Sequence, residues 1–278
     1  MVDAHAHLVS PERAAANRVA GGPPSIDQPT ALADLLALQP WPMSMILVES
    51  NRPHAGENYN LLEVAEADAV LGVIGRLDFH GQDPVSEFQS LLAHPNASKW
   101  RGVRMSMLPA HGDGWSAKVK DLTAALGETD RVLEILASGQ ALAAVAEISR
   151  VAQCTVVLDH LGLPPWTGPD DEWQMWRAEM IRLADTTSIF CKWSALPALG
   201  SAGQEARADE ATDLALDAFG PARLMYASNM PWPPGLTDLD DSYPVKRAVA
   251  TASTLAADES KALLGGTCRL AYGIQQTP

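Results

Sequence analysis

The chain begins with Val2-Asp-Ala-His-Ala-His7, an alternation of small apolar and polar residues that is typical of a β-strand. Successive side chains of a strand point to opposite faces, so Asp3, His5 and His7 are expected on one face and the alanines on the other. In a barrel strand, one face lines the interior and the other packs against helices. We expect two imidazoles within about 7 Å of each other inside the fold, an arrangement that suits a metal ion. The alternative is that they are ordinary core histidines.

Seven further apolar runs follow this stretch, and amphipathic helical patterns lie between and after them. The runs lie near residues 44–49, 70–78, 101–108, 131–137, 155–160, 188–194 and 223–228. The helical patterns lie near residues 30–38, 58–67, 84–93, 118–126, 140–152, 172–185, 205–219 and 245–264. Eight such units are the number that closes a parallel (β/α)₈ barrel, an α/β fold. An open doubly wound sheet is the alternative, although no glycine-rich phosphate loop follows the first run.

Composition and charge exclude several classes of protein. The formal net charge of −14 argues against binding to nucleic acid or to an anionic membrane, since either would need a basic face. The three cysteines are far apart and suggest neither a disulfide framework nor a metal site, which favours a reducing cytoplasmic compartment. There is no apolar leader and no run of about 18 apolar residues. We expect a cytoplasmic protein that forms a single domain over residues 1–278.

Six short motifs, spread over the chain, point to a family. They are Asp3-Ala-His-Ala-His7, Trp100-Arg-Gly-Val-Arg104, Val157-Leu-Asp-His-Leu-Gly162, Cys191-Lys-Trp-Ser194, Arg223-Leu-Met-Tyr-Ala-Ser-Asn-Met-Pro231 and Leu264-Gly-Gly-Thr-Cys-Arg-Leu-Ala-Tyr-Gly273. In this order they resemble the amidohydrolase-related family (amidohydrolase 2 type), which includes fuconolactonase-like and 2-pyrone-4,6-dicarboxylate lactonase-like enzymes. The resemblance implies a distorted (β/α)₈ barrel whose active site lies at the C-terminal mouth of the strands. It also implies a lactone hydrolase, another hydrolase or a decarboxylase.

The resemblance implies which residues form the site. His5 and His7 match the pair on the family's first strand, and His160 matches the histidine that ends its sixth strand. These three histidines would hold one divalent metal ion, zinc or manganese. Where the family commonly carries an aspartate at the end of the eighth strand, this chain has Asn229. An amide takes no proton from water near neutral pH and binds metal poorly, so we expect the metal to be weakly held or absent.

Three explanations of Asn229 stay open. The chain can belong to a natural branch of the family, it can be an inactivated variant, or it can bind small molecules without catalysis. The flanking Ala227 and Met230 also depart from the family pattern. A single engineered change would not alter those neighbours, so the natural branch is slightly favoured.

Arg104 and Ser106 are candidates for binding the substrate. Both are expected to point into the barrel, because they alternate with apolar residues along their strand. A guanidinium buried there needs a carboxylate partner or an anionic ligand. Arg104 therefore either binds a substrate carboxylate or forms an internal ion pair with Asp78 or Glu134, and the sequence favours neither.

Two loop residues and one strand residue complete the set. His54, after the second strand, is a candidate for substrate contact, and Trp232, three residues after Asn229, is a candidate pocket wall. Asp159 falls on the face opposite His160, so it is expected to orient or cap rather than react.

The function expected from the sequence is hydrolysis of a lactone, carboxylated or derived from a sugar. The three histidines would polarise the carbonyl group, with His160 as the first choice of general base and Asn229 positioning water or substrate. A non-oxidative decarboxylase of the same barrel family is one alternative, and a non-catalytic small-molecule binder is another. The expected partner is a small anionic or sugar-like lactone, and the sequence leaves the oligomeric state open.

Overall fold

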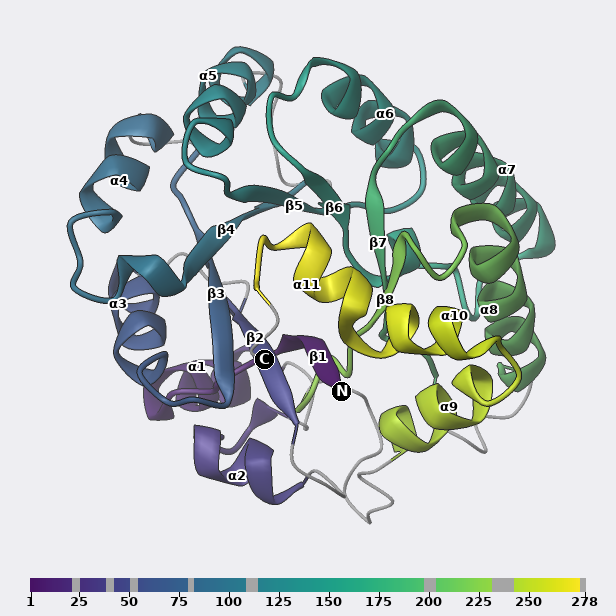
Figure 1. Ribbon diagram of the computed structural model, residues 1–278, viewed down its shortest axis with the longest axis horizontal. Coiled ribbons are helices and arrows are strands. Elements are labelled where there is room, and N and C mark those ends of the chain that lie inside the picture. The colour runs from purple at the N-terminus through teal and green to yellow at the C-terminus, as the bar shows by residue number, and fades with distance from the viewer. Residues whose placement is uncertain are drawn as a thin grey trace.

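The computed structural model describes residues 1–21, 26–38, 43–50, 55–79, 83–108, 115–197, 204–231 and 243–275. Eight strands form one parallel sheet, in the order in which they occur in the chain. They are β1 (Val2–Ala6), β2 (Ser44–Val48), β3 (Val70–Arg76), β4 (Trp100–Ser106), β5 (Val132–Leu136), β6 (Val156–Leu158), β7 (Phe190–Trp193) and β8 (Leu224–Tyr226). Figure 1 shows the strands as a ring inside a circle of helices. The predicted (β/α)₈ barrel is confirmed.

Helices alternate with these strands. They are α1 (Pro11–Ala20), α2 (Leu32–Ala37), α3 (Ala55–Val64), α4 (Pro84–Leu91), α5 (Trp115–Gly127), α6 (Ala141–Val151), α7 (Asp170–Thr186), α8 (Glu205–Phe219), α9 (Tyr243–Ala252), α10 (Ala257–Lys261) and α11 (Thr267–Ala271), with short turns η2 (Ala97–Lys99), η3 (His160–Gly162) and η4 (Ala262–Gly266). Among the described residues, no helix is both long enough and apolar enough to cross a lipid bilayer. A single domain over residues 1–278 stays a prediction.

Local sequence explains where helices begin and which face they bury. In α1, the Ser10 side chain accepts a hydrogen bond from the Arg13 amide, and the helix ends at Gly21 with a φ of 64°. Asp83 caps α4 in the same way, ahead of a proline that suits the first turn. Along α6 the residues Leu142, Val145, Ala146 and Ile148 are buried, a spacing that places one apolar stripe against the sheet.

The last helical segment differs from the expectation. A single helix was predicted near residues 245–264, whereas the structure contains α9, α10 and the π-helical turn η4. The break has a local cause, because Ala256 is extended (ψ of 157°) and its amide donates a hydrogen bond to the Glu259 carboxylate, which starts a new helix. The helix α1 was not predicted at all.

The strands place two sets of side chains on opposite faces. Outward-facing residues such as Leu133 and Ile135 pack with the helices in the larger apolar cluster. Inward-facing residues form a second cluster with α11, which includes Val2, Ala4, Ile46, Val48, Ile74, Val132, Val157, Met225, Cys268, Ala271 and Tyr272. Alternation then carries polar residues inward further along the strands, since Glu134 follows Val132 by two positions and Asp159 follows Val157 by two.

The barrel closes where β1 meets the end of β8. The main chain joins Ala6 to Met230 in a parallel bridge, and the Asn229 amide donates to the His5 carbonyl over 2.8 Å. Asp3 fastens the same seam, because its carboxylate accepts bonds from the Ser228 amide (2.8 Å) and hydroxyl (2.5 Å). These bonds hold the first and the last strand side by side.

The expected alternation along β1 is partly wrong. The register of β1 against β2 shifts between Asp3 and Ala6. As a result Ala4 joins the inner apolar cluster while Ala6 joins the outer one, instead of the two sharing a face. The irregularity lets the strand turn His5 and His7 toward the interior after Asp3 has been directed to Ser228.

The helix α11 covers the end of the barrel at which the strands begin. In Figure 1 it lies across the middle of the ring. Immediately before it, Gly265 has a φ of 155° and approaches Val2 so closely that a Cβ atom would lie 3.0 Å from the Val2 side chain. Tyr272, just after α11, is fully buried and donates its hydroxyl hydrogen to Glu134 over 2.6 Å.

Candidate active site

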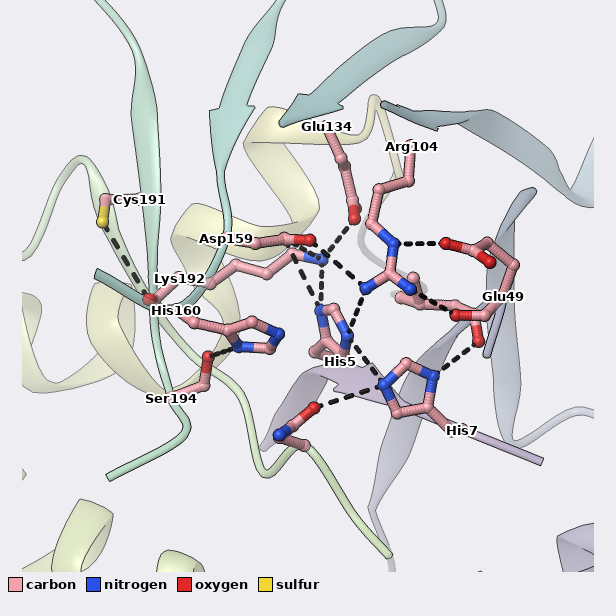
Figure 2. A network of polar contacts seen from close by, with 12 residues as sticks. His5, His7, Glu49, Arg104, Glu134, Asp159, His160, Cys191, Lys192 and Ser194 are labelled. Carbon is pink, nitrogen blue, oxygen red and sulfur yellow. Dashed lines mark hydrogen bonds and ion pairs between the residues drawn. The ribbon is translucent and has the colours of Figure 1, made fainter. Parts of the chain in front are cut away.

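A buried polar cluster fills the barrel above its apolar layer (Figure 2). Its members come from the carboxyl halves of the strands or from the residues just after them, as expected for a site at the mouth of a (β/α)₈ barrel. They are His5, His7, Glu49, Arg104, Glu134, Asp159, His160, Lys192, Ser194 and Asn229. Five of these ten residues are those that the sequence predicts as site residues: His5, His7, Arg104, His160 and Asn229.

His7 is held as a neutral imidazole. Its Nδ1 lies 2.9 Å from the Val48 carbonyl oxygen, which can only accept a hydrogen bond, so Nδ1 carries the proton. Its Nε2 lies 3.1 Å from His5 Nε2 and 3.2 Å from the Asn229 amide oxygen. Burial, aided by the charge of Arg104, lowers the pKa of His7 to about 3. His7 therefore presents a lone pair toward His5 at neutral pH.

His5 lies at the centre of the cluster and is fully buried. Its ring centroid is 4.7 Å from that of His7 and 4.5 Å from that of His160. Burial is the main cause of its pKa lying well below the usual value, and the charge of Lys192 lowers that pKa further. The predicted three histidines do meet at one place.

Lys192 contacts His5 on the side that faces the inner apolar cluster. Its Nζ lies 2.9 Å from His5 Nδ1, 2.7 Å from Glu134 Oε2 and 3.2 Å from Asp159 Oδ1. All four side chains are fully buried. Burial raises the pKa of Glu134 to about 7, whereas nearby positive charge, chiefly that of Lys192, keeps the pKa of Asp159 well below its usual value despite burial. An ammonium group with two acidic neighbours thus lies directly beneath the histidines.

Arg104 points into the barrel as predicted, but its partner is Glu49 instead of Asp78 or Glu134. Its Nε lies 2.5 Å from Glu49 Oε1, and its Nη2 donates to the Glu49 carbonyl over 2.6 Å. Glu49 follows β2 directly and is almost fully buried. The remaining nitrogen, Nη1, lies 3.4 Å from His5 Nε2 and 3.5 Å from Asp159 Oδ2. Ser106, two residues further on, is also buried.

The expected separation of Asp159 from His160 is wrong. The strand β6 ends at Leu158, and Asp159 continues its inward alternation into the polar cluster. His160 would then face outward, but its φ of 55° is left-handed and turns the ring back over the mouth. Three left-handed residues follow His160, and Trp176 on α7 donates to the Leu161 carbonyl over 2.7 Å, which holds the turn.

His160 is also fixed through its ring. Its Nδ1 lies 2.6 Å from the Ser194 hydroxyl, which follows β7. Burial lowers its pKa to about 4, so it is unprotonated at neutral pH. Together with His5 and Asp159, His160 forms a group of possible metal ligands whose donor atoms all lie within 4.8 Å of one another.

This ligand group does not fit an added divalent ion. The Lys192 ammonium already lies between two of the three ligand residues, 2.9 Å from His5 Nδ1 and 3.2 Å from Asp159 Oδ1. The guanidinium of Arg104 lies 3.4 Å from the other nitrogen of His5. Two fixed positive charges therefore touch the central ligand, and a dication would have to overcome their repulsion at low dielectric.

Two of the predicted site residues, His54 and Trp232, lie outside the described residues. Five residues of the cluster were not predicted as site residues, although Glu134 was considered as a partner of Arg104 and Asp159 as an orienting group: Glu49, Glu134, Asp159, Lys192 and Ser194. A signal for Lys192 was present in the sequence: it alternates with Cys191 and Trp193, both of which face outward, so the lysine had to face inward. No comparable signal existed for Glu49, because it ends the predicted run 44–49 after four consecutive apolar residues, which define no polar face.

Comparison with known proteins identifies the family. The family model described as "Amidohydrolase" matches residues 2–274. The chain belongs to the amidohydrolase family. This result confirms the family and the class of enzyme that the motifs predicted, and the match includes every residue of the polar cluster.

Individual relatives of this amidohydrolase share only part of its sequence. An L-fucono-1,5-lactonase of Burkholderia multivorans is 35% identical over 133 residues, and the match spans 44% of each chain, so less than half of the lactonase's length is matched. A solved B. multivorans amidohydrolase with bound zinc is 26% identical over 99% of each chain, with a TM-score of 0.81. A Pseudomonas putida protein named as a 2-pyrone-4,6-dicarboxylic acid hydrolase is 19% identical over 99% of this chain and 98% of its own, with a TM-score of 0.72. At that identity it supports the fold alone.

Proposed function

We propose that this amidohydrolase opens a cyclic ester, a lactone, by adding water. The observation that carries the proposal is that three neutral imidazoles, each with one lone-pair nitrogen, lie together with Arg104 at the mouth of the barrel. Such a site offers a proton acceptor beside fixed positive charge, the pair of functions that ester hydrolysis requires. The partial match to an L-fucono-1,5-lactonase supports the choice of a lactone as substrate.

The proposed electrophilic side of the site is the pair His5 and Arg104. Arg104 Nη1 and His5 Nε2 lie 3.4 Å apart, so both can reach a single substrate oxygen. When water attacks a lactone carbonyl, negative charge develops on the carbonyl oxygen, and fixed donors and positive charge stabilise it most where water is excluded. Because Arg104 is already paired with Glu49, it enters the reaction with a fixed orientation. This role adds to the predicted binding of a substrate carboxylate by Arg104, which stays a proposal.

The proposed general base is His160. It is unprotonated at neutral pH, and its Nδ1 is held by Ser194, which leaves the other ring nitrogen for water. The water oxygen bonds to the carbonyl carbon as one water proton passes to His160. The ring carbon–oxygen bond then breaks, and the leaving oxygen takes that proton, which gives a hydroxy acid and restores the imidazole. Asn229 lies beside His7 and would orient the water or the substrate oxygen.

The substrate class rests on Arg104, because the cations of the site are not in excess over its carboxylates. Arg104 is paired with Glu49, and Lys192 lies between Glu134 and Asp159, in a chain with a formal charge of −14. A carboxylated lactone would have to bind at Arg104 Nη1, which lies farther from its neighbours than Nε and Nη2 do, whereas a sugar-derived lactone would need no such charge. We expect His54 and Trp232 to contribute to the same pocket. Zinc or manganese, if bound at His5, His7 and His160, would be weakly held, and no step proposed here needs it.

A pH-indicator assay over a panel of sugar lactones and carboxylated lactones tests the proposal. The unaltered chain is compared with His160→Ala and with the control His94→Ala, which removes an imidazole that follows α4, outside the polar cluster. Each is measured with EDTA and with added zinc. We expect turnover in the unaltered chain and the control, with a loss of about 100-fold or more in His160→Ala. Full activity in His160→Ala would overturn the mechanism.

The same panel separates the alternatives. Release of carbon dioxide without ring opening would identify a decarboxylase. Binding of lactones without turnover, in every metal condition, would identify a binding protein. Turnover that appears only in Asn229→Asp would identify a site that has lost its carboxylate.

A further inference from the structure

A lysine ammonium occupies the place beneath His5 where a cation would be expected. The atoms around Lys192 Nζ are one imidazole nitrogen and two carboxylate oxygens, His5 Nδ1 at 2.9 Å, Glu134 Oε2 at 2.7 Å and Asp159 Oδ1 at 3.2 Å. Imidazole nitrogens and carboxylate oxygens are also the ligand atoms that a divalent ion binds. Figure 2 shows the ammonium between the carboxylates and His5.

The contact between Lys192 and His5 determines where His5 carries its proton. An ammonium group has three donors and no lone pair, so in this hydrogen bond the lysine donates and His5 Nδ1 accepts. The proton of the neutral imidazole is then on Nε2, because the donor on that side, Arg104 Nη1, is farther from His5 (3.4 Å) than the ammonium is (2.9 Å). That proton points at His7 Nε2, 3.1 Å away, whose lone pair is available because His7 donates from Nδ1 to Val48.

The result is a directional chain of hydrogen bonds from Lys192 through His5 and His7 to the main chain of β2. Every donor in it meets an acceptor, without an added ion. A divalent ion at His5 Nε2 would need the opposite tautomer, with the proton on Nδ1, which faces the ammonium. An ion at His5 Nδ1 would need the space that the ammonium fills. The lysine and the ion are therefore mutually exclusive on His5.

We propose that Lys192 is a built-in cation that takes the place of a divalent ion and holds His5 in the Nε2–H tautomer, with that hydrogen directed to His7 Nε2 until a substrate oxygen takes over the bond. Lys192 is thus a positioning residue, and its effect on catalysis rests on the proposed lactone hydrolysis. Its effect on the tautomer of His5 and on metal affinity does not depend on any substrate. The alternative is that Lys192 only neutralises Glu134 and Asp159, in which case the tautomer of His5 would be indifferent to it.

The first test is nitrogen NMR of the ¹⁵N-histidine-labelled full chain at neutral pH. In the unaltered chain, His5 is expected to show protonated Nε2 and unprotonated Nδ1, and the signal is assigned through its loss in His5→Gln. Lys192→Met is expected to shift His5 toward the Nδ1–H form, which Asp159 would then accept. Lys99→Met is the control, because the Lys99 ammonium donates to the main-chain carbonyl of Val70 instead of to a residue of the polar cluster. It is expected to leave the His5 signals unchanged.

Removing the ammonium leaves two buried carboxylates with less compensation, so Lys192→Met alone can fail to fold. The double variant Glu134→Gln/Lys192→Met removes one charge of each sign and keeps the net charge of the cluster. Circular dichroism and thermal denaturation establish that it is folded before it is compared. Glu134→Gln alone is the matched reference, since it keeps the ammonium.

The second test is zinc binding, measured by titration calorimetry and by metal content after dialysis. Relative to Glu134→Gln, the double variant is expected to bind zinc roughly ten-fold more tightly or better. With EDTA present, its kcat for the best lactone is expected to fall about 100-fold while KM changes little. A His5 tautomer and a zinc affinity that do not change would overturn the proposal, whatever happens to activity. An unaltered chain that turns over no lactone, while both change as expected, would overturn only the proposed function.

Discussion

The side chains of His7 and Asn229 lie 3.2 Å apart, from Nε2 to the amide oxygen, although 222 residues separate them in the chain. His7 donates from Nδ1 to the Val48 carbonyl, so its Nε2 offers a lone pair. That lone pair accepts the hydrogen of His5 Nε2, so the neutral amide oxygen of Asn229 can lie beside it, whereas an ionised carboxylate would place a full negative charge against the lone pair. Asn229 is therefore matched to a neutral His7.

Asn229→Asp should raise the pKa of His7 from about 3, because it places a negative charge beside Nε2. An opposite charge at this distance raises such a pKa by about one to three units. Histidine-detected NMR over a pH series measures it. Asn229→Ser, which adds no charge, is the control and should leave the titration where it is. If His7 titrates alike in both variants, the pairing does not govern its protonation.

Arg104→Met should destabilise the fold by about 3–5 kcal/mol, because it leaves the Glu49 carboxylate buried without its guanidinium. Urea unfolding measures the free energy. The double variant Glu49→Gln/Arg104→Met removes both charges and should recover part of the loss. If the two single changes add in the double variant, Arg104 and Glu49 do not interact energetically.

Acidification should lower stability between about pH 6 and pH 5. His5, His7 and His160 stay neutral in the folded state, where their pKa values are lowered, but take up protons when unfolded. Asp3 and Glu134 act oppositely, since burial raises their pKa values to about 6 and about 7 and the folded state holds those protons. The unfolded state thus binds roughly one more proton net, which corresponds to about 1.4 kcal/mol lost per pH unit. Urea unfolding at each pH measures the free energy of unfolding. A free energy that rises on acidification would contradict these directions of the pKa shifts.

Tyr272→Phe should destabilise the fold by about 1–3 kcal/mol, because Glu134 loses the hydroxyl that donates to it in a fully buried place. That bond lowers the pKa of Glu134, so the variant should raise this pKa above about 7. Thermal unfolding and carboxyl-carbon NMR are the measurements. Tyr226→Phe is a matched control, since Tyr226 is also buried but its hydroxyl has no hydrogen-bond partner in the described part of the chain. An equal effect of both changes would contradict the assignment.

The barrel could be predicted because its signal is local. Eight apolar runs separated by amphipathic patterns define the units, and neighbouring units pair in order. The motif histidines could be assigned for a similar reason, since the end of a strand is visible in the sequence. The face on which His160 lies relative to Asp159 could not be predicted, because the alternation of side chains fails where the backbone becomes left-handed. The residue types in Asp159-His160-Leu161 do not indicate that change.

Which charged residues pair with one another could not be predicted from the sequence. Lys192 and Glu134 each stand between two apolar residues of a strand, so their inward direction was readable. Their contact depends on the tilt and register of β5 and β7, with β6 between them. The choice of Glu49 by Arg104 depends in the same way on β2 and β4, which are separated by β3. Pairings across a barrel are properties of its closure, which no local pattern contains.

The buried link between Tyr272 and Glu134 has a consequence for biosynthesis. His5 is synthesised long before Tyr272, yet both belong to one connected set of polar contacts through Glu134 and Lys192. The seam between β1 and β8 likewise requires Ser228. A nascent chain therefore cannot complete this set of contacts before Tyr272 has left the exit tunnel of the ribosome.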